Sequence, residues 1–230
     1  MSSKKDIAFE KIMADFESMG NLVLRQLDQI ELLMDLGEMT LSDEESEKFK
    51  ANEVKIDMLE VKMNDRIVNT IVLYQPVASE IRQIMAAYRI VISLERIGDY
   101  AVHLVNYLHE IKNLQVYNEL SELINSMFVM STQMLKKALI SFVQHDKASA
   151  LWVIKNDREV DELSQKMLKK VIQKSKEFDD KKKIIVSFIT IKDMIDNIIR
   201  IADQASNIAE STIYYLEGKD VRHIPLFEDE

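Results

Sequence analysis

Acidic residues spaced four apart recur in this sequence. They form the pairs Glu53/Asp57, Glu95/Asp99 and Asp157/Asp161. Residues four apart stand one turn above the other on one face of an α-helix. Clustered carboxylate oxygens bind hard cations such as Mg²⁺, Mn²⁺, Ca²⁺ or oxidised iron. A single pair is more typical of a solvated helix face than of a metal site, so the evidence for a site comes from the repetition of the pairs and from their positions in the fold.

The chain repeats itself at a constant offset of 104 residues. The phrase RIGD at 96–99 returns as RIAD at 200–203, and the first acidic pair returns as Asp157/Asp161. This offset holds without a gap over more than fifty residues. It indicates two copies of one unit, because a solenoid would need three or more.

The two copies differ at one position of the acidic pattern. Ile199 stands where the first copy has Glu95, which leaves Asp157, Asp161 and Asp203 as the acidic set of the second copy. Gly98 is a further feature of the first copy. Glycine costs about 1 kcal/mol in a helix interior, so its presence there indicates close approach of another element.

Long helices are needed to hold these residues, and the composition favours them. The 230 residues include only Gly 4 and Pro 2, too few for a protein rich in turns and hairpins. Hydrophobic residues at 47% and charged residues at 30% exclude an intrinsically disordered chain. Apolar residues recur at spacings of three and four between a few breaks, which predicts six long helices. Their expected bounds are 6–36, 44–74, 77–112, 117–145, 149–178 and 182–217.

Consecutive long helices with short connections run antiparallel and form bundles. We therefore predict an all-α protein of two tandem, duplicated three-helix bundles, over residues 1–114 and 115–230. Ser42 followed by Glu45 predicts a capping box at the start of the second helix.

The predicted turn at Gln75-Pro76 brings two acidic pairs to the same level of the first bundle. Asp57 lies about 18 residues before this turn and Glu95 about 19 after it, so both are about 28 Å away. Glu53, Asp57, Glu95 and Asp99 are then expected to converge. Like charges this close repel one another, and a bound cation would relieve the repulsion.

Composition also argues against several classes of protein. The absence of cysteine excludes disulfides, thiolate metal sites and a cysteine nucleophile. A net charge of −9 argues against nucleic acid as a partner. No apolar run approaches the ~20 residues of a membrane span, and the N-terminus lacks the apolar region of a signal peptide. We expect a cytoplasmic protein without direct membrane insertion.

A carboxylate-bridged di-metal enzyme is the alternative from another class. Such enzymes in helical bundles use Glu-x-x-His pairs on facing helices, and this sequence contains none. A non-enzymatic role is favoured for this reason. A structural helical protein with solvated acidic faces and no metal is a third alternative.

Several segments resemble one known family. LYQPVASEIRQI with SLERIGDYAVHLVNYL, and later IIRIADQASNIAESTIYYLEGKDVRH, are similar to the signature segments of the PhoU family of phosphate-transport regulatory proteins. The resemblance covers essentially the whole chain. The departures are Ile199, and Tyr100 and Gln204, which stand where the family often has His.

The resemblance implies a fold, a chemistry and a role. It implies paired three-helix bundles, often as a homodimer, with iron, manganese, zinc or magnesium on carboxylate clusters. The implied ligands are Glu53, Asp57, Glu95, Asp99, Asp157, Asp161 and Asp203. The implied role is a cytoplasmic negative regulator of phosphate uptake and phosphate-starvation signalling. It would be an adaptor between the ATPase subunit of a phosphate ABC transporter and a sensor histidine kinase, or an accessory protein of a different phosphate transporter.

Overall fold

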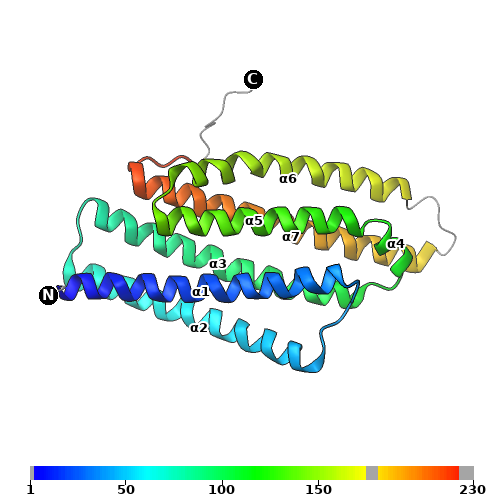
Figure 1. The fold of residues 1–230 in the computed structure, drawn as a ribbon, viewed down its shortest axis with the longest axis horizontal. Coiled ribbons are helices and arrows are strands. Elements are labelled where there is room, and N and C mark those ends of the chain that lie inside the picture. Colours follow the sequence, from blue (N-terminus) through cyan, green and yellow to red (C-terminus); the bar gives the residue numbers. More distant parts are fainter. Residues whose placement is uncertain (1–2, 175–180, 223–230) are drawn as a thin grey trace, which may run out of the picture.

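The computed structural model describes residues 3–174 and 181–222, and this part of the chain consists of seven helices and their connections (Figure 1). The helices are α1 (Lys4–Asp35), α2 (Asp43–Tyr74), α3 (Ser79–Glu110), α4 (Leu114–Asn118), α5 (Ser121–Gln144), α6 (Lys147–Lys174) and α7 (Lys181–Glu217). The prediction of an all-α helical bundle is confirmed. Six of the helices match the six predicted ones to within a few residues at their described ends.

The fourth predicted helix, 117–145, is wrong at its start, because two helices occupy this segment. Asn113 caps the short helix α4, and its side-chain oxygen accepts from the backbone amides of Gln115 at 3.0 Å and Val116 at 3.3 Å. Tyr117 and Leu120 are buried, so the chain packs over the end of the bundle before α5 begins. The predicted end of the fifth helix at 178 lies outside the described residues.

Local signals at the ends of α2 behave as the sequence predicts. Ser42 and Glu45 form a capping box, in which the Ser42 hydroxyl accepts from the Glu45 amide at 3.4 Å. The Glu45 carboxylate in turn accepts from the Ser42 amide at 3.0 Å. At the other end Gln75 adopts the left-handed conformation with φ of 44°, directly before Pro76, and α2 ends there.

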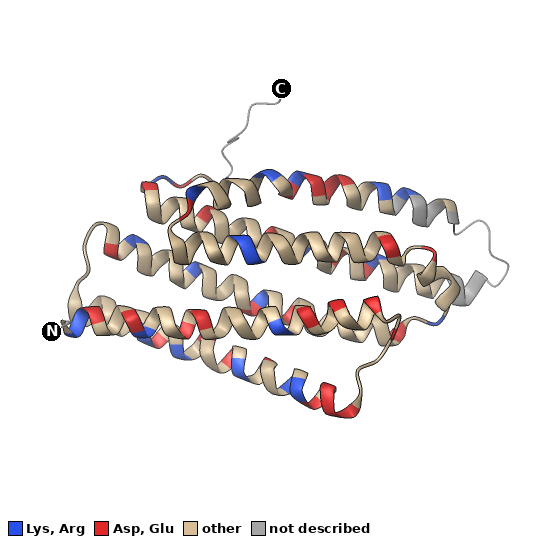
Figure 2. Cartoon of the chain, in the orientation of Figure 1, with Lys and Arg blue, Asp and Glu red and all other residues tan. Residues whose placement is uncertain are grey.

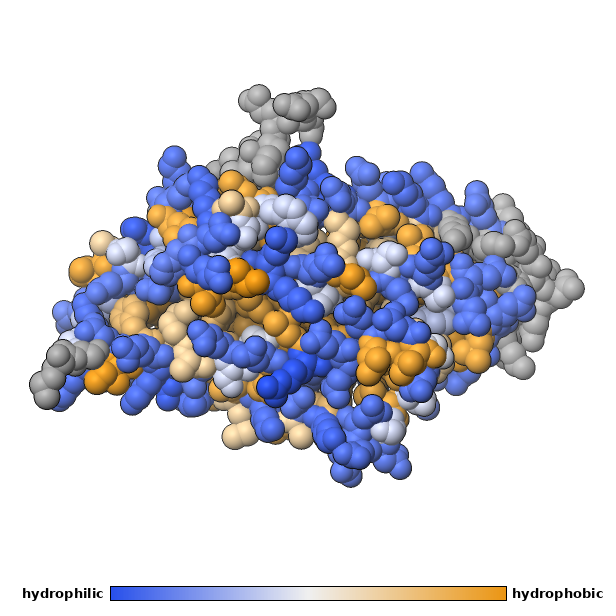
Figure 3. All heavy atoms as spheres, in the orientation of Figure 1, coloured by the Kyte–Doolittle hydropathy of each residue, from blue (hydrophilic) through white to orange (hydrophobic). Residues whose placement is uncertain are grey.

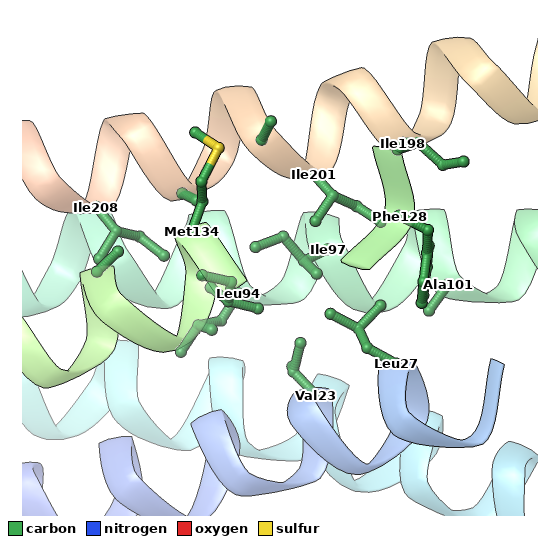
Figure 4. Packing of buried hydrophobic residues seen from close by; sticks show 14 of the residues in the cluster. Val23, Leu27, Leu94, Ile97, Ala101, Phe128, Met134, Ile198, Ile201 and Ile208 are labelled. Carbon is green, nitrogen blue, oxygen red and sulfur yellow. The ribbon is translucent and has the colours of Figure 1, made fainter. Parts of the chain in front are cut away.

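Each set of three long helices packs together, and the two sets share one continuous hydrophobic core. Helices α1, α2 and α3 form the first bundle and α5, α6 and α7 the second, while α3 packs on α7 and α1 on α5 between them. Side chains from both sides meet in this core, among them Leu27, Leu94, Phe128, Ile201 and Ile208 (Figure 4). The boundary predicted between residues 114 and 115 falls at the start of α4.

Charged residues are spread over the outer faces of the long helices, as Figure 2 shows. On the same side of the molecule, apolar side chains are exposed among the hydrophilic ones (Figure 3). A groove of about 400 Å³ runs here between α1 and α5, with Gly20, Leu24, Leu139 and Ile140 in its lining. Within residues 3–174 and 181–222, no helix combines the length and the apolar character needed to cross a membrane.

Candidate metal centres

The seam between α2 and α3 brings the predicted acidic residues of the first copy together. The carboxylates concerned are Glu53, Asp57, Glu60, Glu95 and Asp99, which we call cluster 1. They come from successive turns of two antiparallel helices that connect through the turn at Pro76. The buried Ile56 lies between the first two on α2 and holds this helix against α3.

Glu95 has the most strongly shifted pKa in cluster 1. The pKa of its carboxyl group is raised to about 7, chiefly because partial burial deprives the charged form of hydration. The neighbouring charges of Asp99, Glu60 and Asp57 contribute to this rise, and the Arg96 guanidinium opposes it. The carboxyl group therefore carries a proton over part of the neutral pH range.

Glu53 is the member of cluster 1 that contacts α1. Burial is the main reason why its pKa is raised, and the charges of Asp57 and Asp99 act in the same direction. The side-chain amide of Gln26 opposes this rise by donating to Glu53 Oε2 at 3.1 Å. Gln26 is fully buried, and its Oε1 has no hydrogen-bond partner within the described part of the chain.

Gly98 lies where α2 comes close to α3. A Cβ atom at this position would be 3.5 Å from Ile56 and 3.6 Å from Glu53 Oε2. These are ordinary van der Waals distances, so α2 passes Gly98 no closer than an alanine would allow, and the close approach expected from this glycine is not confirmed. The second copy carries such a methyl group at the buried Ala202.

The second copy forms a smaller group of carboxylates between α6 and α7. It contains Asp157, Asp161 and Asp203, which we call cluster 2. The pKa of Asp203 is raised to about 6, mainly by burial and also by the charges of Asp157 and Asp161, while Arg200 opposes the rise. Burial also raises the pKa of Asp157, while the Ser206 hydroxyl acts in the opposite direction.

Cluster 2 lacks a counterpart of Glu95. Ile199 occupies that position, is partly buried and packs against the hydrophobic core. Asp196, one turn before Arg200 on α7, forms an ion pair with Lys192 at 2.5 Å on its own helix. Ser164 stands at the counterpart of Glu60, so cluster 2 keeps three carboxylates where cluster 1 has five.

The sequence interpretation missed Glu60 of cluster 1 and Gln26, the hydrogen-bond partner of Glu53. Glu60 stands one turn beyond Asp57 on the same face of α2, so the helical period that identified the acidic pairs also contained it. Gln26 lies among the buried apolar positions of α1, between Val23 and Ile30. A polar residue on the core-facing side of a helix was the available signal, since buried polar groups require partners.

A contact between α3 and α7 links the helices that carry the two clusters. The guanidinium of Arg200 stacks over the ring of Tyr100, with 5.8 Å between its central carbon and the ring centre. Tyr100 directly follows Asp99 of cluster 1, and Arg200 precedes Asp203 of cluster 2 by three residues. This contact is one of those between the helices that carry the two clusters, because α3 and α7 pack along each other.

The donor set of both clusters is composed of oxygen atoms, the type that hard cations prefer. Their raised pKa values show that the carboxylates are close enough to disfavour each other's charge. Among the residues that the structure describes, however, no three His, Cys, Asp or Glu side chains already converge on one point where a metal ion would fit. The clusters therefore offer the oxygen donors and the negative charge that suit a hard cation, while the described side chains do not form a ready coordination site.

Comparison with known sequences places both halves of the chain in one family. The sequence model of the PhoU domain matches residues 16–108 and again residues 124–212. The two matches cover the two copies inferred from the internal offset.

Curated relatives and solved structures agree with this match. The chain is 29% identical over 227 residues to a phosphate-specific transport system accessory protein PhoU homolog from Burkholderia sp, covering 97% of this chain and 93% of the relative. It is 28% identical to the accessory protein PhoU of Escherichia coli (strain K12), covering 97% and 90%. The crystal structure of the phosphate transport system regulatory protein PhoU from Streptococcus pneumoniae superposes with a TM-score of 0.81 at 21% identity, covering 95% and 99%. That of PhoU from Pseudomonas aeruginosa superposes with a TM-score of 0.76 at 24% identity, covering 93% and 99%.

Proposed function

Because this chain belongs to the PhoU family, we propose that it is an accessory protein that regulates a phosphate transport system. The observation that carries the proposal is the double match of the PhoU domain, once in each copy. Relatives named as accessory proteins of phosphate transport align over 97% of the chain, so the likeness is not confined to one motif. A non-enzymatic role agrees with these names.

The two carboxylate clusters are proposed to bind metal ions. Glu53, Asp57, Glu95 and Asp99 would hold a cation in cluster 1, and Asp157, Asp161 and Asp203 in cluster 2. A bound cation would neutralise carboxylates whose mutual repulsion and burial now raise their pKa values. It would act as a cross-link between neighbouring helices, stiffening the outer faces on which a partner would dock. Iron, manganese, zinc and magnesium are the candidates.

The unequal donor sets predict unequal metal binding. Asp99→Ala is expected to remove more metal per chain than Asp203→Ala, because cluster 2 has already lost one ligand at Ile199. Elemental analysis after reconstitution with iron, manganese, zinc or magnesium measures the loss. Equal losses would contradict the asymmetry. A chain that retains no metal above background in any of these buffers would refute the metal proposal itself.

The role proposed at the molecular level is a cytoplasmic adaptor. One face would contact the ATPase subunit of a phosphate ABC transporter and another a sensor histidine kinase, repressing uptake and starvation signalling when phosphate is plentiful. Support comes from the family and from the long exposed helix faces, which offer extended docking surfaces. The test is a pull-down with the purified ATPase subunit encoded nearest to this chain, followed by measurement of its ATPase rate. If the ATPase subunit is not retained and its ATPase rate does not change, the adaptor role is refuted.

An accessory role at a different phosphate transporter is the alternative within the same class. It predicts retention of that transporter's subunit in place of the ABC ATPase, so the same pull-down with both candidates distinguishes them. The di-metal enzyme considered from the sequence gains no support from relatives named as accessory proteins.

A further inference from the structure

A fully buried glutamine on α1 lies against cluster 1. Gln26 is 0% exposed, and the buried residues Val23 and Leu27 beside it on α1 are apolar. Its side-chain Nε2 donates to Glu53 Oε2 at 3.1 Å, while its Oε1 atom has no hydrogen-bond partner within the described chain. A buried polar atom without a partner destabilises a fold, so packing alone does not account for a glutamine at this position.

The second copy shows that the fold accepts an apolar side chain at this position. The two matches of the PhoU domain begin at residues 16 and 124, which gives the first helices of the two copies an offset of 108 residues. The connection before α2 is longer than the one before α6, which explains why the later helices have the smaller offset of 104. At the offset of 108, buried residues fall on buried residues: Met19 on Met127, Leu27 on Leu135 and Ile30 on Ala138. Gln26 falls on Met134, which is 0% exposed.

The partner of Gln26 is a carboxylate that contacts both other helices of the first bundle. Glu53 extends from α2, accepts a hydrogen bond from Gln26 of α1, and interacts with the Asp99 carboxyl group of α3. Its Oε2 atom, which Gln26 binds, also lies 3.6 Å from where a Cβ atom at Gly98 of α3 would be. One oxygen of the Glu53 carboxylate is thereby held from α1, which limits the rotation of the whole group.

We propose that Gln26 is a positioning residue for a cation in cluster 1. This inference rests on the metal binding proposed above and adds a third helix to the site. The Nε2 amide holds Glu53 in one orientation, so less side-chain freedom is lost when a cation binds. The Oε1 atom offers a buried acceptor to a water molecule of the cation, because hard cations such as Mg²⁺ retain part of their hydration. Partners that orient ligands in this way contribute to metal affinity together with the ligands themselves.

Cluster 2 has no such contact with its first helix. The thioether of Met134 cannot donate a hydrogen bond, and the hydroxyl that acts on Asp157 comes from Ser206 of α7. Cluster 1 therefore reaches the first helix of its bundle through a polar side chain, and cluster 2 does not. Since α1 also packs on α5 of the second bundle, a cation in cluster 1 would restrain a helix that takes part in the contact between the bundles.

The first experiment gives the first copy the side chain of the second. Gln26→Met in the full chain removes the amide and keeps the length of the side chain, and the fold already accommodates Met134 at the equivalent position. Isothermal titration of metal-free protein with Mn²⁺ should show binding about 10- to 100-fold weaker than with Gln26 in place, the usual effect of removing such a partner. Both chains also carry Asp203→Ala, which weakens cluster 2 so that the titration reports on cluster 1.

A thermal melt shows that the variant is folded before its affinity is compared. On addition of the same concentration of Mn²⁺, the melting temperature should rise more with Gln26 in place than in Gln26→Met, because tighter binding stabilises the folded state more. A residue that only stabilised the fold would change the melting temperature without changing the Mn²⁺ affinity of the folded protein. If Gln26→Met does not fold, Gln26→Leu takes its place.

The matched control is Gln29→Met, one turn further along α1. The Oε1 atom of Gln29 is also buried without a partner, but Gln29 is not a hydrogen-bond partner of Glu53 or Glu95 in the described chain. Gln29→Met should therefore bind Mn²⁺ as tightly as the chain with both glutamines. Equal weakening by Gln29→Met and Gln26→Met would overturn the proposal, because the effect would then belong to α1 as a whole.

The remaining outcomes separate this inference from the metal proposal. If Gln26→Met binds Mn²⁺ as tightly as the chain with Gln26, the role of Gln26 is refuted and metal binding stands. If the natural chain binds no Mn²⁺, this inference is overturned, and the metal proposal falls with it when iron, zinc and magnesium are not bound either. The accessory role in phosphate transport has its own test in the pull-down.

The second experiment follows the effect on α1 by hydrogen exchange. Mn²⁺ should slow the exchange of the α1 backbone amides near Gln26 in the natural chain, because the helix is then held against a filled site. This slowing should be absent in Gln26→Met. Equal slowing in both chains would contradict a link from cluster 1 to α1 through this side chain.

Discussion

At the scale of single residues, the environment of a carboxyl group determines its behaviour more than its position in an acidic pair does. Glu95 and Glu44 are both glutamates on long helices. Partial burial among other carboxylates raises the pKa of Glu95 to about 7, whereas a hydrogen bond from Lys48 lowers the pKa of the exposed Glu44. Glu95 therefore changes its charge near neutral pH, whereas the exposed Glu44 beside Lys48 is charged there.

The raised pKa of Glu95 predicts a pH dependence of stability. An unfolded glutamate has its ordinary pKa of 4.5, so between about pH 4.5 and 7 the folded state binds more protons than the unfolded state. The contribution of Glu95 to the free energy of unfolding therefore falls as the pH rises through this window. In metal-free buffer, Glu95→Gln should lose less stability between pH 5 and 8 than the natural chain, as measured by urea unfolding.

The control for this measurement is Glu110→Gln, which changes an exposed carboxylate at the end of α3. It should follow the natural chain at every pH. The same pH profile for Glu95→Gln and the natural chain would show that Glu95 titrates alike in both states, contrary to its surroundings.

At the scale of helices, ion pairs connect α1 to its neighbours, and these pairs differ in how deeply their side chains are buried. Asp15 on α1 is only 8% exposed and accepts from two cations of α2. Lys62 Nζ donates to its Oδ1 at 2.9 Å, and Arg66 pairs with its Oδ2 while also donating to the Lys11 carbonyl. Asp28 on the same helix pairs with Lys136 of α5 at 3.0 Å, but both side chains are largely exposed.

Removal of these two carboxylates should have unequal effects. Asp15→Ala leaves a partly buried guanidinium without its partner and is expected to lower the free energy of unfolding by about 2 kcal/mol. Asp28→Ala removes a solvated pair and is expected to lower it by less than about 1 kcal/mol. Urea unfolding of both variants measures the difference. A similar decrease in the free energy of unfolding for both would mean that the burial of Asp15 does not strengthen the contact between α1 and α2.

At the scale of the whole molecule, the two copies behave as halves of one structure. Helix α3 of the first copy packs along α7 of the second, and both contribute fully buried residues to the shared core. Leu94, Ile97 and Ala101 are examples on α3, and Ile201 and Ile208 on α7 (Figure 4). A bundle separated from its partner would expose this surface to water.

The shared core predicts one cooperative unfolding transition. In calorimetry the van't Hoff enthalpy should equal the measured enthalpy, which is the test of two-state behaviour. A fragment of residues 1–114 should show little cooperative unfolding, because its α3 face has lost α7. Two separate transitions, or a stably folded fragment, would instead show that 1–114 and 115–230 are independent units.

Particular elements show which features of the fold can be predicted from the sequence alone. The acidic pairs and the capping box at Ser42 follow from local patterns, and each lies where the pattern predicts. The short helix α4 was missed, because its start depends on the Asn113 cap and its path on the burial of Tyr117. The position of Gln26 beside Glu53 was missed too, since it depends on how α1 crosses α2.

Sequence by itself determined the long helices, the duplication, the matched carboxylates and the missing glutamate at Ile199. The helical period is a property of neighbouring residues, and the internal offset is found by comparing the sequence with itself, so neither needs the folded structure. Tertiary structure alone decided which of the two apolar stripes of α2 is buried. One stripe contains Ile56 and Met63 and the other Val54 and Val61, and both have helical spacing. The physical reason is that burial depends on which helices surround α2, and that follows from packing over the whole chain rather than from the order of residues within one helix.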